Sequence, residues 1–379
     1  MPRPPRPGIR WRALALPAIL LAAAACSSQA PILVGLAGPL SDPVGAPMQR
    51  AARLAIEEIN AAGGVAGRPI ELVEYDDYGH PDSAVAVAST LRLTGVVAVI
   101  GHVWSGTTLA AAAVYGSGSD PVPVISPSSS APEVTAAGPH VFRVCPTDDA
   151  HGTALAQWAL RGIGATRAAV LYLNDDYGRG IRRSFETTFA RLGGEIVSTN
   201  PYLDVRSDAG PFLDLLARDR QAEVLLVAGD RREALEILAQ ARARGLTIPV
   251  LGGDGLEGIE ADGPLAEGVF VSTAWLPDGR EPRAQRFLDA YAARYPGEGV
   301  PNQPAAAAYD IAHLLAGALR TAGTDRARLL EALAEIGRSV AEHPGVTGLI
   351  GFTERRDLAR GSTVISVVRE GRLVRAEAR

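Results

Sequence analysis

Short apolar runs alternate with amphipathic segments along most of this chain. Runs such as 32–37, 96–100 and 168–173 are too short for helices and rich in aliphatic residues, which is typical of strands buried on both faces. The segments between them predict helices with one apolar face, such as the face formed by Ala51, Ala52, Ala55, Ile56 and Ile59. The alternation occurs in two blocks. It predicts an α/β protein made of two doubly wound parallel-sheet lobes.

Two of the predicted strands end in hydroxyl side chains. These are Ser105 after the strand at 96–100, and Ser128, Ser129 and Ser130 after the strand at 122–126. Ligands of open parallel sheets bind beyond the carboxyl ends of the strands, and the free N–H groups of helix starts attract anions. The pattern therefore predicts a site for a small carboxylate. A local role remains an alternative, because Ser105 could be an N-cap and Ser130 with Glu133 has capping-box spacing.

Composition and charge limit the class of protein. With 379 residues and 47% hydrophobic residues, the chain can form two domains and is not mainly disordered. The formal net charge is −5, and every basic residue other than histidine is arginine. This balance argues against a nucleic-acid partner.

The N-terminal segment predicts export. Residues 1–25 have a basic start followed by an apolar run of signal-peptide proportions. Small residues before Cys26 resemble a bacterial lipobox, although Ala23 stands where that motif usually has leucine. Lipidation of Cys26 would anchor the chain to a membrane through a tether at 26–30; ordinary cleavage is the alternative. Because Cys145 is the only other cysteine, a mature chain lipidated at Cys26 has no internal disulfide.

Several motifs together resemble one family, the leucine/isoleucine/valine-binding proteins. These are amino-acid-binding components of ABC importers with the type I periplasmic binding fold. The motifs are ILVGLAGPLSDPVG, AIEEINAAGGVAGRPIELVEYDD, VIGHVWSGTTLAAAAVY, VISPSSSAPEVT, LNDDYGRG and GFTERRDL. The resemblance implies a monomer in the periplasm or on the outer face of the cell envelope that delivers its ligand to a membrane permease. It also implies a three-segment hinge, with 31–145 plus 276–358 as lobe 1 and 146–275 plus 359–379 as lobe 2.

The resemblance also implies roles for individual residues. Ser105 matches a serine that bonds the ligand α-carboxylate, and Ser128 and Ser130 match positions that hold the carboxylate and the ammonium. Tyr177 matches a second-lobe tyrosine that covers the ligand. Asp254 lies where an acidic residue binds the ammonium. With Ser129 and Trp104, these residues form the expected ligand-binding set.

Three departures from the family bear on the ligand. Trp104 replaces a smaller residue, so it would narrow the pocket, stack on a flat ligand or fill a gap behind the loop. The sequence Asp230-Arg231-Arg232 stands where a tyrosine is common, and an arginine facing the cleft would favour a ligand with a second acid. Gly79 and Trp104 replace a small disulfide. The ligand is therefore expected to be a small amino acid or a related carboxylate or amide. The three departures argue against a leucine-type specificity.

Other function classes are weighed against this hypothesis. A ligand sensor of the same fold, coupled to a signalling partner, has the same sequence features. An enzyme is not expected, because Ser105 lacks the G-x-S-x-G setting of a hydrolase nucleophile. No spacing typical of a zinc site or a phosphate loop is found, so neither metal nor cofactor is expected. His102 is interpreted as a loop or packing residue.

Overall fold

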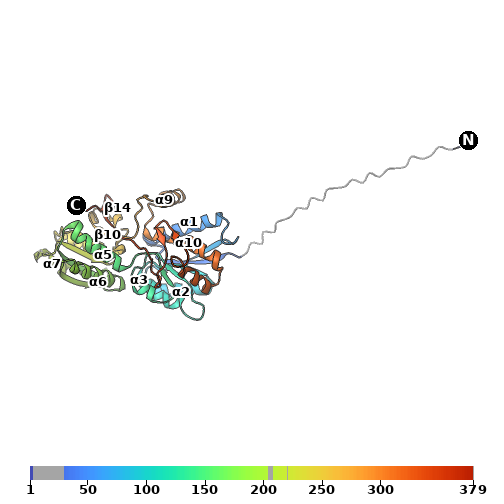
Figure 1. Ribbon diagram of the computed structural model, residues 1–379. Helices are drawn as coiled ribbons and strands as arrows, with labels where there is room; N and C mark the ends of the chain where they lie inside the picture. The colour runs from blue at the N-terminus through green and yellow to red at the C-terminus, as the bar shows by residue number, and fades with distance from the viewer. Residues whose placement is uncertain (3–29, 204–207, 220, 379) are drawn as a thin grey trace.

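The computed structural model describes residues 1, 2, 30–203, 208–219 and 221–378. The predicted signal peptide and Cys26 lie outside these residues. The described chain forms two α/β lobes, one containing α1, α2, α3 and α10 and the other α5, α6 and α7 (Figure 1). Each lobe has its own sheet and its own apolar core.

The first lobe is built on a parallel sheet of order β2-β1-β3-β4-β5. Its strands are β1 (Ile32–Gly38), β2 (Ile70–Asp76), β3 (Ala98–Ile100), β4 (Val124–Ser126) and β5 (Val141–Arg143). Its helices are α1 (Gly45–Ala61), α2 (Pro81–Thr94), α3 (Ser105–Tyr115), α4 (Glu133–Ala136), α9 (Pro282–Arg294), α10 (Gln303–Ala322) and α11 (Arg326–Ala334). A small hairpin pairs β11 (His343–Pro344) with β12 (Leu349–Ile350).

The second lobe has the sheet order β14-β13-β10-β9-β8-β6-β7. Its strands are β6 (Arg167–Leu173), β7 (Glu195–Tyr202), β8 (Val224–Ala228), β9 (Val250–Gly252), β10 (Phe270–Thr273), β13 (Val364–Arg369) and β14 (Arg372–Arg375). Its helices are α5 (Asp148–Trp158), continued by the π-helical turn η1 (Ala159–Ile163), α6 (Asp176–Arg191), α7 (Gly210–Asp219) and α8 (Arg231–Ala243). Two 3-10 segments, η2 (Asp254–Leu256) and η3 (Ile259–Leu265), follow β9.

The apolar pattern of α10 explains its place in the first lobe. Ile311, Leu314, Leu315 and Leu319 are buried and pack with Val34 and Ile100 of the sheet. These residues recur at helical spacing, so one long face of α10 can cover the sheet. The helix begins at the cleft side with Asn302, whose side chain accepts a hydrogen bond from the Ala305 N–H. The start of α10 is thereby fixed relative to the core.

Each sheet has a point where consecutive connections leave in opposite directions. In the first sheet this switch lies between β1 and β3, and in the second between β6 and β8. The loops beyond such adjacent strand ends leave a crevice that commonly holds ligands. The chain crosses between the lobes three times: from β5 to α5, from β10 to α9, and from the β12 region to β13. Two crevices are thus brought to face each other.

The predicted fold class is confirmed, with two differences in detail. The second sheet is only mostly parallel, because β13 runs antiparallel to β10 and β14 antiparallel to β13. No helix is predicted from the sequence at 210–219, yet α7 occupies this segment and buries Phe212, Leu213 and Leu216. Asp208 accepts a hydrogen bond from the Gly210 N–H and so helps to fix its start.

Candidate functional site

A cleft lies where the two switch points meet. Its enclosed volume is about 40 Å³, and the empty space is about 510 Å³ when the open solvent at its mouth is included. Its wall is formed by Val44, Val103, Trp104, Ser105, Gly106, Ser128, Ser130 and Pro304 of the first lobe and by Asp175, Tyr177, Asp230, Asp254, Gly255 and Glu257 of the second. The lobes also touch beside it, where α3 packs on α6. Of the predicted set of site residues, only Ser129 is absent from this wall.

Ser105 and Ser130 form a hydroxyl-rich wall on the first lobe. Ser105 is the first residue of α3, and its Oγ accepts a hydrogen bond from the Ala131 N–H at 3.1 Å. Its hydroxyl proton thus remains available to a ligand. The Oγ of Ser130 is buried and makes no close hydrogen bond with the described residues, and it lies near the buried carboxylate of Asp148, whose ionised form it favours. Two buried hydroxyls beside the free N–H groups of α3 are suited to a carboxylate.

The alternative that these serines are helix caps is wrong. The N-cap of α3 is Trp104, and no side chain caps that helix. The N-cap of α4 is Pro132, so Ser130 and Glu133 do not form a capping box. Ser105 instead links two successive strand-end loops through its bond to Ala131.

Ser128 and Ser129 are neighbours with different surroundings. Ser128 is half-buried and lines the cleft. The Oγ of Ser129 is shared by Thr108, at 2.7 Å, and by the Val103 carbonyl, at 3.0 Å. Its hydroxyl therefore joins the two loops and is not exposed on the cleft wall.

Trp104 is held at the mouth of the first-lobe crevice. It lines the cleft, and its ring lies directly against the backbone of Gly79, where a Cβ would be 1.7 Å from the ring. Behind the same loop, His102 is fully buried and its Nδ1 lies 2.5 Å from Asp77 Oδ2. The interpretation of His102 as a packing residue agrees with this position.

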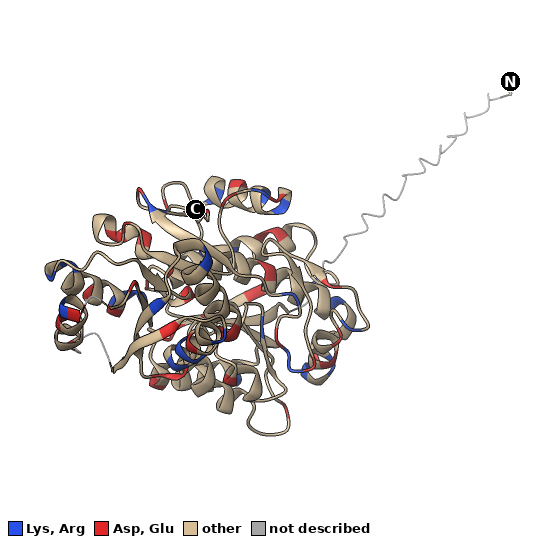
Figure 2. Ribbon diagram, turned by 60° about the vertical axis from the view of Figure 1, so that its left-hand side comes forward, with Lys and Arg blue, Asp and Glu red and all other residues tan. Residues whose placement is uncertain are grey.

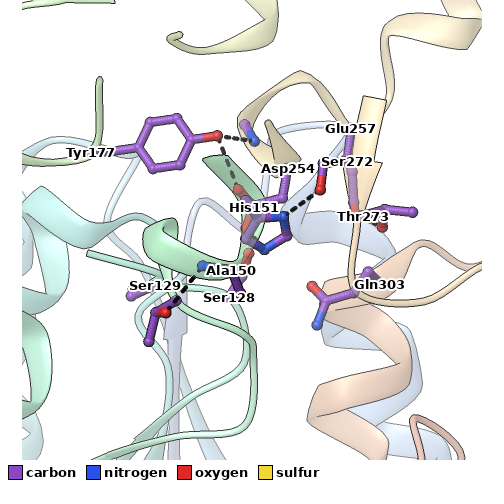
Figure 3. A network of polar contacts seen from close by, with 12 residues as sticks. Ser128, Ser129, Ala150, His151, Tyr177, Asp254, Glu257, Ser272, Thr273 and Gln303 are labelled. Carbon is purple, nitrogen blue, oxygen red and sulfur yellow. Dashed lines mark hydrogen bonds and ion pairs between the residues drawn. The ribbon is translucent and has the colours of Figure 1, made fainter. Parts of the chain in front are cut away.

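On the second lobe, Tyr177 and Asp254 act as one unit (Figure 3). The Tyr177 hydroxyl donates to Asp254 Oδ1 at 2.9 Å and accepts from the Gly255 N–H at 2.7 Å. Glycine is needed at 253, because a Cβ there would be 2.4 Å from the tyrosine oxygen. Burial, followed by the charge of Asp254, raises the pKa of Tyr177, so the phenol stays protonated. It orients the carboxylate of Asp254 toward the cleft.

A buried histidine lies on the other side of Asp254. His151 Nε2 is 3.5 Å from Asp254 Oδ2, while His151 Nδ1 is 2.9 Å from the Ser272 hydroxyl (Figure 3). Asp254 is thus held between α6 and α5 by groups of its own lobe. It is not an isolated turn residue.

Sequence reasoning misses Glu257, which lies where the two lobes approach each other. It is buried, lines the cleft and accepts a hydrogen bond from the Thr273 hydroxyl. The backbone N–H of Gln303, at the start of α10 in the first lobe, lies close enough to favour its ionised form. Burial outweighs these contacts and raises the pKa of Glu257 well above its usual range. Its position depends on η2, for which the sequence carries only a weak turn signal.

Asp175 and Asp230 are two further acidic residues that the sequence-based set omits. They follow β6 and β8, the strands that flank the switch point of the second sheet. Asp175 caps α6 by accepting from the Gly178 N–H at 2.7 Å. Asp230 precedes α8 but makes no capping bond. Burial, followed by the charge of Asp175, raises the pKa of Asp230 to about 8.

No arginine of the described chain lines this cleft. Arg231 forms two hydrogen bonds of 2.8 Å with Asp262, and Arg232 is exposed. The possibility of an arginine facing the cleft is therefore wrong for both residues. Elsewhere acidic and basic residues are interspersed on the outer helices of both lobes (Figure 2). The acidic character is a local property of the cleft.

The described residues carry no further chemistry of the metal-binding or membrane-spanning kind. No group of three or more His, Cys, Asp or Glu side chains there is arranged to hold a metal ion. No helix in those same segments has the length and apolar character needed to cross a membrane. Cys145 is a buried free thiol, and its burial raises the thiol pKa.

Comparison with known proteins identifies relatives over nearly the whole chain. A family model described as periplasmic binding protein matches residues 29–371. The leucine-, isoleucine-, valine-, threonine- and alanine-binding protein of Pseudomonas aeruginosa is 32% identical over 340 residues, covering 86% of this chain and 87% of that protein.

Solved structures agree with these matches. The branched-chain amino acid transporter substrate binding protein LivJ from Streptococcus pneumoniae, in complex with isoleucine, is 28% identical. Its TM-score is 0.81, covering 92% of this chain and 99% of that one. An ABC transporter substrate-binding protein from Desulfitobacterium hafniense, in complex with leucine, is 29% identical with a TM-score of 0.78, covering 92% and 100%.

Proposed function

The chain belongs to the periplasmic binding protein family, in the group that includes the leucine/isoleucine/valine-binding proteins, and we propose that it binds a small amino acid in the cleft and delivers it to an ABC permease. One observation carries the proposal. Buried hydroxyls of the first lobe and a carboxylate of the second line the same cleft. This polarity is complementary to a zwitterion.

The first lobe would hold the ligand carboxylate. The unused proton of Ser105 and the buried hydroxyl of Ser130 would both donate to it, beside the N-terminus of α3. Ser128 would contribute from the same strand-end loop. Ser129, whose hydroxyl is already bonded on the protein side, would support the loop and not touch the ligand.

The second lobe would hold the ligand ammonium through Asp254. Each ion taken out of water costs several kcal/mol unless a counter-charge and hydrogen bonds replace the water. A dissociation constant near 1 μM corresponds to only about −8 kcal/mol, so an unpaired ammonium would abolish useful affinity. Tyr177 uses its hydroxyl on Asp254 and Gly255, so it would position the acid and cover the ligand with its ring.

The same proposal includes how the molecule opens and where it resides. Lobe boundaries near 145/146, 275/276 and 358/359 would form a three-segment hinge, about which the lobes close on the ligand. The chain would act as a monomer outside the cytoplasm. Residues 1–25 would be removed as a signal peptide, and Cys26 would carry the lipid anchor; mass spectrometry of the mature protein tests this step.

Ligand binding is tested by thermal shift with the twenty protein amino acids, then by calorimetry on every compound that stabilises the protein. A ligand that binds only the folded protein at 100 times its Kd stabilises it by about 2.7 kcal/mol. We expect at least one amino acid to raise the Tm and to do so less in Ser105→Ala. If no amino acid raises the Tm of the wild-type protein, the proposed function is wrong.

A further inference from the structure

Apart from Tyr177, the ionisable side chains that line the cleft are all carboxylic acids. Asp175, Asp230, Asp254 and Glu257 line it, and no described cationic side chain shares the wall. A zwitterion brings one positive group, which Asp254 can pair. Three acidic side chains then remain without a protein cation on the wall.

Two of these three acids lie together. Asp175 and Asp230 follow neighbouring strands at the switch point of the second sheet, and the charge of one raises the pKa of the other. One carboxylate oxygen of Asp175 accepts a hydrogen bond from the Gly178 N–H. Asp230 is half-buried, and its side chain makes no hydrogen bond with the described residues. It is therefore an acceptor that faces the cleft without a partner.

A second observation shows that the cleft is built for a bound molecule. Ser130 lines it and is 1% exposed; its Oγ makes no close hydrogen bond in the described chain, and it lies near the buried carboxylate of Asp148, whose ionised form it favours. A buried hydroxyl without a partner is rare unless a ligand or water completes it. The cleft thus combines a buried hydroxyl on the first lobe with Asp230, a carboxyl group without a hydrogen-bond donor among the described residues, on the second.

On this basis we propose that the preferred ligand is a small amino acid with a second cationic group, an amine or a guanidine, in its side chain. Asp230 and Asp175 bind this second cation, while Asp254 binds the α-ammonium. Val44, Trp104 and Pro304 enclose the aliphatic part between them. The inference rests on the proposed function and specifies its ligand class. The departure from a leucine-type pocket follows, since a leucine side chain leaves both acids unpaired.

The physical advantage is selectivity. An aliphatic side chain that displaces water from Asp175 and Asp230 supplies no replacement hydrogen bonds, so binding carries the desolvation penalty of both acids. An amine or guanidine restores those bonds with charge assistance. Sites of this kind discriminate strongly against analogues that lack the polar group.

The test compares matched ligand pairs by calorimetry on the full protein. Ornithine is paired with norleucine and arginine with citrulline, because each pair differs mainly in one positive charge. We expect the wild-type protein to bind the cationic member of at least one pair ten-fold or more tightly than its neutral partner. Asp230→Asn should remove most of this difference by weakening the cationic member and not the neutral one. Glu236→Gln is the control, since Glu236 is exposed on α8 and bonds only Gln240 on its own helix.

The outcomes separate the two proposals. If neutral amino acids bind as well as or better than the cationic ones, the ligand class is wrong and the amino-acid-binding function stands. Equal weakening of both members by Asp230→Asn also overturns the inference, because it indicates a structural role. If no amino acid of either kind binds, the proposed function itself fails and the inference falls with it.

Discussion

Replacing Asp254 with asparagine is the sharpest single perturbation of the binding cleft. Asparagine keeps the shape of the side chain and its Oδ1, so it can still accept the hydrogen bond that Tyr177 donates at 2.9 Å. The replacement removes only the charge. Burial dominates the raised pKa of Glu257 and of Asp148, and the charge of Asp254 adds to both. The ligand-free protein should therefore not lose stability when Asp254 is neutralised.

The expected loss of affinity follows from the ion pair that disappears. Removing one partner of a buried, hydrogen-bonded pair costs about 3–5 kcal/mol, and a charge-assisted hydrogen bond at a more accessible site about 1.5–3 kcal/mol. Asp254 is nearly buried, with 6% of its side chain exposed, so a loss of about 3 kcal/mol is expected. This corresponds to a rise in Kd of roughly 150-fold.

Calorimetry with the best amino-acid ligand measures this change, and thermal unfolding without ligand measures the stability. Glu236→Gln again controls for the change in net charge. An unchanged Kd in a folded Asp254→Asn protein would exclude Asp254 from ammonium binding. A marked drop in the Tm of the ligand-free variant would show that the carboxylate has a structural role that its hydrogen bonds to Tyr177 do not explain.

Three further predictions concern the neighbouring residues. Trp104→Ala should change the order of ligand affinities more than the free energy of unfolding, because the ring is only partly buried; calorimetry with the ligand panel checks this, and an equal loss for every ligand would contradict it. Gly79→Ala should weaken binding and lower the Tm, since the added Cβ collides with the Trp104 ring and φ at 79 is +70°; an unchanged Tm would show that the ring moves freely. The pKa of Asp230 is about 8 in the folded protein and about 4 in the unfolded chain. Between these two pH values the folded state binds a proton on Asp230 that the unfolded state has lost, so the free energy of unfolding of the ligand-free protein should fall as pH rises. The acids Asp175, Glu233 and Asp254 and the cation Arg232 act on this group, and Asp230→Asn should reduce the slope of Tm against pH in this interval.

The sequence predicts most of the fold because its signals are local. Apolar runs bounded by glycine and polar residues predict the strands, and the same strand ends predict Ser105, Ser128 and Ser130 on the cleft wall. Ser129 is different: only the tertiary contact between its hydroxyl and Thr108 shows that it is used inside the protein. Adjacent positions in a loop cannot be separated by pattern alone.

The acidic side of the cleft could have been predicted in part. Asp175 and Asp230 follow β6 and β8 by the same rule that identifies the serines, but their side chains resemble ordinary helix caps in sequence. Glu257 carries no such signal, because its place depends on the turn through η2 and on the approach of α10 from the other lobe. The sequence also does not show that Arg231 turns away from the cleft, because its partner Asp262 lies 31 residues further along the chain.

The meeting of Glu257 with the start of α10 has a kinetic consequence. Together with the contact of α3 on α6, it joins the two halves of the molecule. These contacts between the lobes must break before a ligand can enter or leave the cleft. Opening of the two lobes, and not diffusion, would then limit the rates at which a ligand associates and dissociates.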